Sequence, residues 1–505
     1  MRKDFDRWAQ FKDPQCQQLF LSMVLPSKLI HLLRGLPPDY TAKLTKAYGG
    51  FQRSAVCHLA GVSTITDIQF ARAQQGTGSG GAGQRDLDMM RDPAYVSAFL
   101  AGMPAMVAAV PDLVARLTTA YEADVDSPDS LTGIDSADHF LKSVRLLEDE
   151  GSGYSLQVLL AVTEEGLKAL QKKLTSHRKL QKREAMEASL RLDKASFAHY
   201  EGGNTGDAGA WLRAIPRSES LIISCLEFRQ AFRNRCGIPH PGIPGDRPQC
   251  NICPTKKFKG TLDPEGHHLQ KCKAMHCYTN RTHDGVVQTL EEFMKASGLP
   301  VEKEVSNLLF LADPENDSRM DLVVSETGKQ RVAYDVQVVN NVALAQERNL
   351  RASIPGAQIK KAEAIKNAKY QAPCNDSGLG FKPLILTSQG NFSETLSNMI
   401  SQTIDDFSKR ANIPKSNVQP YWTQRISVAL QTAVARGQLN RMALSNAKRA
   451  KSLDDPTATS ECARQGVLEV DHVRIASSNY GGGGAGGGVA GGGRDGLGAG
   501  GARLV

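Results

Sequence analysis

The sequence contains no apolar run long enough to cross a membrane. A spanning helix needs about 18 or more consecutive apolar residues, and no segment of the 505-residue chain reaches that length. The opening Met-Arg-Lys-Asp-Phe-Asp also lacks the apolar centre of a secretory signal. The glycines from Gly76 to Gly83 are not followed by the Lys-Ser or Lys-Thr pair of a phosphate-binding loop. We therefore expect a soluble intracellular protein with no membrane partner, and a flexible loop at these glycines.

Cysteine is present but forms no paired framework. Ten cysteines are spread along the chain, and three of them lie between Cys250 and Cys272. This distribution favours a reducing compartment over a secretory one. A hydrophobic content of 41% supports two or three domains with true cores. The net charge of +8 suits a polyanionic partner but is shared by many unrelated proteins.

One cluster of metal-ligand residues has the spacing of a zinc site. Cys250 and Cys253 form a C-x2-C pair, and His267 and Cys272 follow as H-x4-C. Three thiolates and one imidazole can bind a tetrahedral zinc ion, and a site filled by four protein ligands is structural. The alternative is a coincidental cluster of buried thiols. The residues that compete with these four as ligands are His268, His276 and Cys277.

Two aspartates downstream flank a predicted hairpin. Asp321 and Asp335 lie equally far from Gly328, within two β-branched apolar runs. An in-register hairpin places them opposite each other with Cβ atoms about 5 Å apart. Two carboxylates this close favour a divalent cation, Mg²⁺ or Mn²⁺, which can activate water. The alternative is two aspartates that merely solvate the strand ends.

The whole block resembles the C-terminal part of non-LTR retrotransposon proteins, which have a CCHC zinc knuckle and a restriction-like endonuclease. In that family the nuclease fold is similar to PD-(D/E)xK enzymes, and the activity nicks chromosomal DNA to prime reverse transcription. The resemblance implies that Asp321 and Asp335 bind the catalytic metal. The motifs shared with the family are the four zinc ligands, Arg281-Thr-His283, Arg319-Met-Asp321, Asp335-Val-Gln337-Val-Val339 and Lys366-Asn-Ala-Lys369-Tyr370.

Two positions depart from the family pattern. Met320 replaces the usual proline, and Gln337 replaces the lysine of the wider superfamily. Glutamine can orient a water molecule but supplies no positive charge. Lys366 or Lys369, on a helix predicted from 358 to 370, could replace that lysine, although both could equally lie on a solvated helix face. His283 and Arg281 are further candidates, for phosphate contact or for completing the site.

The N-terminal part is similar to the segment that follows the polymerase palm in the same elements. No Asp-Asp pair occurs in a Tyr-x-Asp-Asp context, so we expect no polymerase activity, and the chain is interpreted as a truncated element copy or a separately encoded fragment. The resemblance implies a nuclear location and a reverse transcriptase partner encoded elsewhere. The predicted organisation is a helical thumb- and linker-like region at 1–150, a basic helical linker at 151–245, the zinc knuckle at 246–280, the endonuclease domain at 281–450 and a disordered glycine-rich tail at 451–505.

A long helix predicted from Glu164 to Lys194 has many basic positions. One interpretation is contact with nucleic-acid phosphates, and the other is a solvated face. Helices are also predicted over 15–70, 87–121, 391–409 and 421–441, with a buried strand over 382–387. The expected function is a metal-dependent DNA endonuclease with structural Zn²⁺, and the alternative is a non-catalytic remnant that binds DNA or RNA. The basic candidates on the helix are Lys172, Lys173, Arg178, Lys179, Lys182 and Arg183.

Overall fold

A computed structural model of the full chain defines the fold. It describes residues 7–452 apart from 9, 124, 126, 128, 130, 244–248, 254–259, 273–275, 307–318, 326–327, 329, 343–353 and 355. The chain divides into two compact units, Met1–Met442 and Ala443–Val505. In the second unit the described residues are the last ones of a long helix that ends at Ser452. This helix includes the first two positions of the predicted tail, and the rest of the tail lies outside the described residues. No described helix is both long and apolar enough to cross a membrane.

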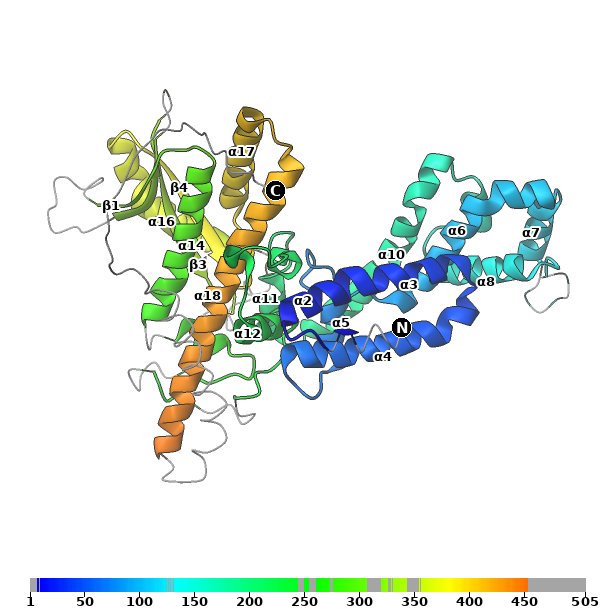
Figure 1. The fold of residues 1–505 in the computed structure, drawn as a ribbon, viewed down its shortest axis with the longest axis horizontal. Helices are drawn as coiled ribbons and strands as arrows, with labels where there is room; N and C mark the ends of the chain where they lie inside the picture. The colour runs from blue at the N-terminus through cyan, green and yellow to red at the C-terminus, as the bar shows by residue number, and fades with distance from the viewer. Residues whose placement is uncertain are drawn as a thin grey trace, which may run out of the picture. The chain divides into compact units, whose positions relative to one another are not determined.

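The described part of the chain is mostly helical, with one small sheet (Figure 1). The helices before the knuckle are α2 (Pro14–Leu19), a π-helical turn (Phe20–Val24), α3 (Leu25–Gly35), α4 (Pro38–Ala60), α5 (Asp67–Gln74), α6 (Leu87–Ala109), α7 (Leu113–Glu122), α8 (Asp135–Asp149), α9 (Leu156–Leu160), α10 (Glu164–Leu190), α11 (Lys194–Glu201), short 3₁₀ turns (Ala210–Arg213 and Glu219–Leu221) and α12 (Cys225–Cys236). The elements after them are α13 (His267–Lys271), α14 (His276–Ala296), β1 (Val301–Ser306), β2 (Arg319–Val324), β3 (Val332–Val339), α16 (Ala357–Asp376), β4 (Gly380–Thr387), α17 (Glu394–Ala411) and α18 (Lys415–Ser452).

The apolar spacing of the N-terminal region produces the expected helices. Tyr95 and Phe99, one turn apart on α6, are buried in a core shared with α8 and α10. The predicted flexible loop is instead held in place. Buried Arg235 donates hydrogen bonds to the carbonyls of Gly81 (2.9 Å) and Thr77 (2.5 Å). A distant guanidinium therefore satisfies two carbonyl groups of this loop.

The sheet has four strands in the order β1-β2-β3-β4. The pairs β1–β2 and β2–β3 are antiparallel, whereas β3–β4 is parallel and is connected through α16. In the hairpin, Leu322 pairs with Tyr334 and Val323 pairs with Ala333. The predicted register of the hairpin is therefore confirmed.

Helices cover both faces of the sheet (Figure 1). On one face, apolar residues of α14, α17 and α18 form a core with the sheet, and Leu290, Ile400 and Ile426 are fully or almost fully buried there. On the other face, Tyr370 of α16 packs with Met320 and Phe381. Ser393 caps α17, since its side chain accepts a hydrogen bond from the backbone of Leu396. Three layers of helix, sheet and helix thus hold the hairpin at their centre.

Candidate active site and metal centre

The two predicted aspartates come from neighbouring strands of the hairpin. Extending the register one step beyond the Leu322–Tyr334 pair places Asp321 across from Asp335. The strands form here because β-branched and apolar residues fill both covered faces of the sheet. Asp321 is 9% exposed and Asp335 is 5% exposed, so both carboxylates are nearly removed from solvent. Buried carboxylates require a compensating cation or hydrogen-bond donors.

Asp321 is held by a helix and by its neighbouring strand. Its Oδ2 atom lies 3.1 Å from His283 Nε2 on α14 and accepts a hydrogen bond of 2.7 Å from the backbone N–H of Val336. The Nδ1 atom of His283 lies 3.2 Å from Asp284. The carboxylate of Asp321 thus has a fixed position between α14 and β3.

Asp335 is paired with a lysine from the opposite layer. Lys366 Nζ of α16 lies 2.6 Å from Asp335 Oδ2. Burial raises the pKa of Asp335, and the nearby negative charge of Asp321 raises it further, whereas Lys366 lowers it. Lys369 is exposed, and its Nζ lies 4.6 Å from the ring centroid of Tyr370. The structure therefore brings one of the two candidate lysines to the aspartates and leaves the other on the outer face of the helix.

The imidazole of His283 supplies a second positive charge. Its hydrogen bond with Asp321 raises the pKa of His283 to about 9, despite the opposing effect of burial. His283 is therefore protonated at neutral pH in the metal-free fold. Arg281, two residues earlier on α14, is exposed at the protein surface. The site thus combines two negative carboxylates with two positive side chains, so the charges balance in a region that water hardly reaches.

The same residues fit a divalent cation. Mg²⁺ and Mn²⁺ prefer carboxylate and amide oxygens, and Gln337 lies two positions after Asp335, on the same side of β3. The Oε1 atom of Gln337 is buried and has no hydrogen-bond partner among the described residues. Asp321 and Asp335 thus supply two buried carboxylates to a cation at this position, and the unpartnered amide oxygen of Gln337 lies on the same strand as Asp335.

A second group of ligands gathers in the knuckle. The Sγ atom of Cys272 lies 3.9 Å from that of Cys250 and 3.7 Å from that of Cys253. His268 Nε2 lies 3.3 Å from Cys253 Sγ, and the four ligand atoms are all within 4.8 Å of one another. Sulfur atoms on one tetrahedral zinc, with bonds of about 2.3 Å, lie about 3.8 Å apart. Hydrogen bonding with Cys272 lowers the pKa of Cys250 well below its usual value, whereas burial raises the pKa of Cys253. The residues present therefore fit one zinc ion.

The histidine in this group is His268, whereas the sequence interpretation had chosen His267. The ring of His267 packs against His199 instead, with ring centroids 4.6 Å apart. Asp263 fixes this arrangement, since its two carboxylate oxygens accept the backbone N–H groups of both histidines at 2.7 Å. Gly260, which the sequence interpretation overlooked, makes room for the ligand: a Cβ atom there would lie 2.0 Å from His268 Nδ1. The side chains of the rival ligands His276 and Cys277 lie outside the described residues.

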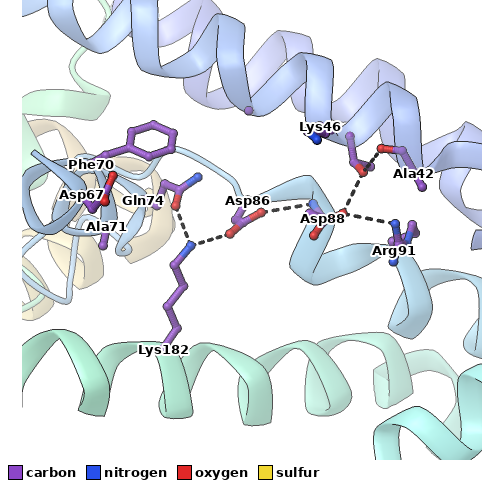
Figure 2. Close-up of a pocket in the computed structure, with 12 residues that line it drawn as sticks. Ala42, Lys46, Asp67, Phe70, Ala71, Gln74, Asp86, Asp88, Arg91 and Lys182 are labelled. Atoms are coloured by element: carbon purple, nitrogen blue, oxygen red, sulfur yellow. Dashed lines mark hydrogen bonds and ion pairs between the residues drawn. The ribbon is translucent and has the colours of Figure 1, made fainter. Parts of the chain in front are cut away.

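Of the six basic candidates on α10, three are paired with acidic side chains and three are exposed. Arg178 Nη1 lies 3.0 Å from Asp92, which is buried, and Arg178 Nε lies 2.6 Å from Glu150. Figure 2 shows Lys182 between Gln74 and Asp86, with its Nζ 2.6 Å from each, beside a cavity of about 550 Å³. The remaining candidates are Arg183, which pairs with Glu187 at 2.6 Å, and Lys172, Lys173 and Lys179, which are exposed.

These ion pairs change the interpretation of α10. Three of its six candidate cations neutralise acidic side chains of the fold, so they are not available to phosphates without breaking those pairs. The paired residues connect α10 to neighbouring N-terminal elements, whereas Lys172, Lys173 and Lys179 remain exposed candidates for phosphate contact. Comparison with protein-family models and with curated proteins finds no match to this chain.

Proposed function

We propose that this protein is a metal-dependent DNA endonuclease with a restriction-like α/β core. One observation carries the proposal: Asp321, Asp335, His283 and Lys366 come from two strands and two helices, and their side chains pair around a single hairpin. Such a convergence of buried ionisable groups is typical of active sites. A mixed sheet covered by helices on both faces also supports the proposal of a restriction-like α/β core.

The side chains divide the chemistry between them. Asp321 and Asp335 would hold Mg²⁺ or Mn²⁺, which supplies an activated water and charge neutralisation when bound. Lys366, beside Asp335, stabilises the negative charge that develops on the scissile phosphate. His283 orients Asp321, and Gln337 offers an acceptor that can hold the attacking water. Hydrolysis adds this water to phosphorus and releases the sugar oxygen, which takes up a proton.

The outer face of α16 is the side of the site that we assign to DNA. Lys361 and Lys369 are exposed on it, and Ile365 between them is 57% exposed. Lysines at this spacing neutralise backbone phosphates, and an exposed apolar side chain between them can contact a groove. We propose that DNA bound along this face extends to Lys366 of the same helix, where a phosphate would reach the carboxylates.

The test is nicking of supercoiled plasmid by the full chain in Mg²⁺ or Mn²⁺. Asp321→Asn and Asp335→Asn keep the size of the side chains but remove the charges that hold the metal, so nicking should fall by about 100-fold or more. Asp406→Asn, an exposed position on α17, is the matched control and should nick like the parent chain. Equal nicking by the parent and both site variants would overturn the assignment.

A parent chain that folds and binds DNA but does not nick it in either metal would also reject the endonuclease. The chain would then be a nucleic-acid-binding protein, the alternative expected from the sequence. In that case the salt dependence of DNA binding should still decrease when Lys361 or Lys369 of α16 is replaced.

A further inference from the structure

The short helix α13 joins the zinc ligands to the catalytic sheet. It spans His267–Lys271, so it contains His268 and ends directly before Cys272, and its Gln270 points toward the ends of two strands. Gln270 Oε1 accepts a hydrogen bond of 2.6 Å from Asn340 Nδ2, directly after β3, and one of 2.8 Å from Ser388 Oγ, directly after β4. An amide oxygen accepts two hydrogen bonds, so both of its lone pairs are used.

The contact continues into the helix that carries Lys366. The backbone carbonyl of Asn340 accepts a hydrogen bond of 3.2 Å from Gln358 Nε2, in the first turn of α16. The ends of the two strands are also tied together, because the backbone N–H of Ser388 donates to the carbonyl of Val339 at 2.7 Å. A single side chain of the knuckle therefore holds β3, β4 and the start of α16.

A second set of hydrogen bonds connects the knuckle to α14, the helix that carries His283. Arg441 of α18 is buried, and its Nη1 donates to the backbone carbonyl of Leu269 in α13 at 2.9 Å. Its Nη2 donates at 2.9 Å to Thr279 Oγ1, one turn before His283 on α14. Hydrogen bonds therefore lead from the knuckle to every element that supplies a residue to the carboxylate site except β2, which is paired with β3.

From these contacts we propose that the zinc knuckle is a clamp for the nuclease core and that Gln270 is its positioning residue. Zinc fixes α13 through His268 and Cys272, and α13 sets the ends of β3 and β4. The alignment of the parallel pair then fixes Asp335 against α16 and Lys366. The proposal rests on the proposed function for its effect on catalysis, but its structural part does not need the protein to cut DNA.

This role differs from direct nucleic-acid binding by the knuckle. If the knuckle only bound DNA, a substitution on α13 would leave the structure of the sheet unchanged. A clamp transmits the free energy of zinc binding to residues about 16 Å away along β3, the length of five extended residues. Loss of Gln270 should therefore loosen the strand ends even when zinc remains bound.

The experiment measures amide hydrogen exchange of the zinc-loaded full chain. In Gln270→Ala, exchange of the amides at 336–339 and 384–387 should increase by about tenfold, as expected for two lost neutral hydrogen bonds. Gln270→Glu keeps a side-chain oxygen that accepts from Asn340 and Ser388, so it should retain most of the protection. Gln157→Ala, on an exposed position of α9, is the matched control and should change nothing in the sheet.

Zinc content and nicking complete the test. Bound zinc, measured by displacement with a chromophoric chelator, should be the same in Gln270→Ala as in the parent chain. Nicking by that variant should slow by about tenfold at saturating DNA with unchanged DNA affinity, because misplaced catalytic groups lower kcat. If Gln270→Ala does not fold, Ser388→Ala removes one of the two bonds and should show a smaller increase at the same amides.

Unchanged exchange at 336–339 and 384–387 in the variants that fold would overturn the clamp, whatever the protein does to DNA. Increased exchange in a chain that never nicks DNA would retain the clamp and reject the nuclease. The two proposals therefore fail by different measurements.

Discussion

Replacing Lys366 by methionine removes one charge from the carboxylate site and keeps the aliphatic stem of the side chain. Lys366 Nζ lies 2.6 Å from Asp335, whereas Lys369, three residues later on the same helix, is exposed and contacts the ring of Tyr370. Removal of a preorganised group that stabilises transition-state charge costs about 10²- to 10³-fold in rate, or about 2.7–4 kcal/mol. We expect Lys366→Met to lose this much nicking and Lys369→Met to stay within about twofold of the parent chain.

The assay is single-turnover nicking of supercoiled plasmid with enzyme in excess, which separates the chemical step from product release. DNA affinity is measured in parallel at several salt concentrations. Lys369→Met should lower the slope of log affinity against log salt by about one unit, as expected for one lost phosphate contact. Equal rate losses in the two variants, or a larger loss for Lys369→Met, would refute the assignment of Lys366.

Three further predictions test the rest of the structure. Arg178→Met should cost about 2–4 kcal/mol of folding free energy because it removes the nearest cation from buried Asp92 and from half-buried Glu150, whereas exposed Lys172→Met should cost less than about 0.5 kcal/mol; urea unfolding measures both. Gly260→Ala should weaken zinc binding in a chelator competition because the new Cβ displaces the ligand imidazole, whereas Gly49→Ala, with open space around it on α4, should leave zinc binding unchanged. Burial lowers the pKa of His240 to about 3, below the usual 6.5, so the unfolded chain binds the extra proton and stability should fall by up to about 1.4 kcal/mol per pH unit as pH decreases from about 6.5 toward 3. Urea midpoints at pH 7 and pH 5 should therefore differ less in His240→Gln than in the parent chain, and equal differences would contradict this.

The hairpin shows how much of the site could be predicted from the sequence. Two β-branched apolar runs around a glycine set the strands, and the equal distances of Asp321 and Asp335 from Gly328 set the register, so the two aspartates could be paired without coordinates. The Ser393 cap of α17 was equally readable, because a cap depends on residues within one turn. Both features are encoded by near neighbours in the chain.

The zinc group shows where this reasoning stops. Spacing identified the cysteines, but His267 and His268 are adjacent and either can satisfy it. Asp263 and the missing Cβ of Gly260 turn the ring of His268 toward the sulfurs, and both act through the folded arrangement of the knuckle. The choice between the two imidazoles therefore required coordinates.

The charged residues were the least predictable from the sequence. Lys366 and Lys369 cannot be told apart from the sequence, yet only Lys366 forms an ion pair with a carboxylate from a distant segment. The same holds for Arg178 when it is compared with Lys172. The sequence by itself determined the hairpin strands and β4, most helices, the paired aspartates and three of the four residues of the Cys/His group, since periodicity and spacing are local. Only the tertiary structure decided which cations are partnered, which histidine joins the cysteines and that Gln270 reaches both strand ends, because a side chain's partner depends on long-range packing.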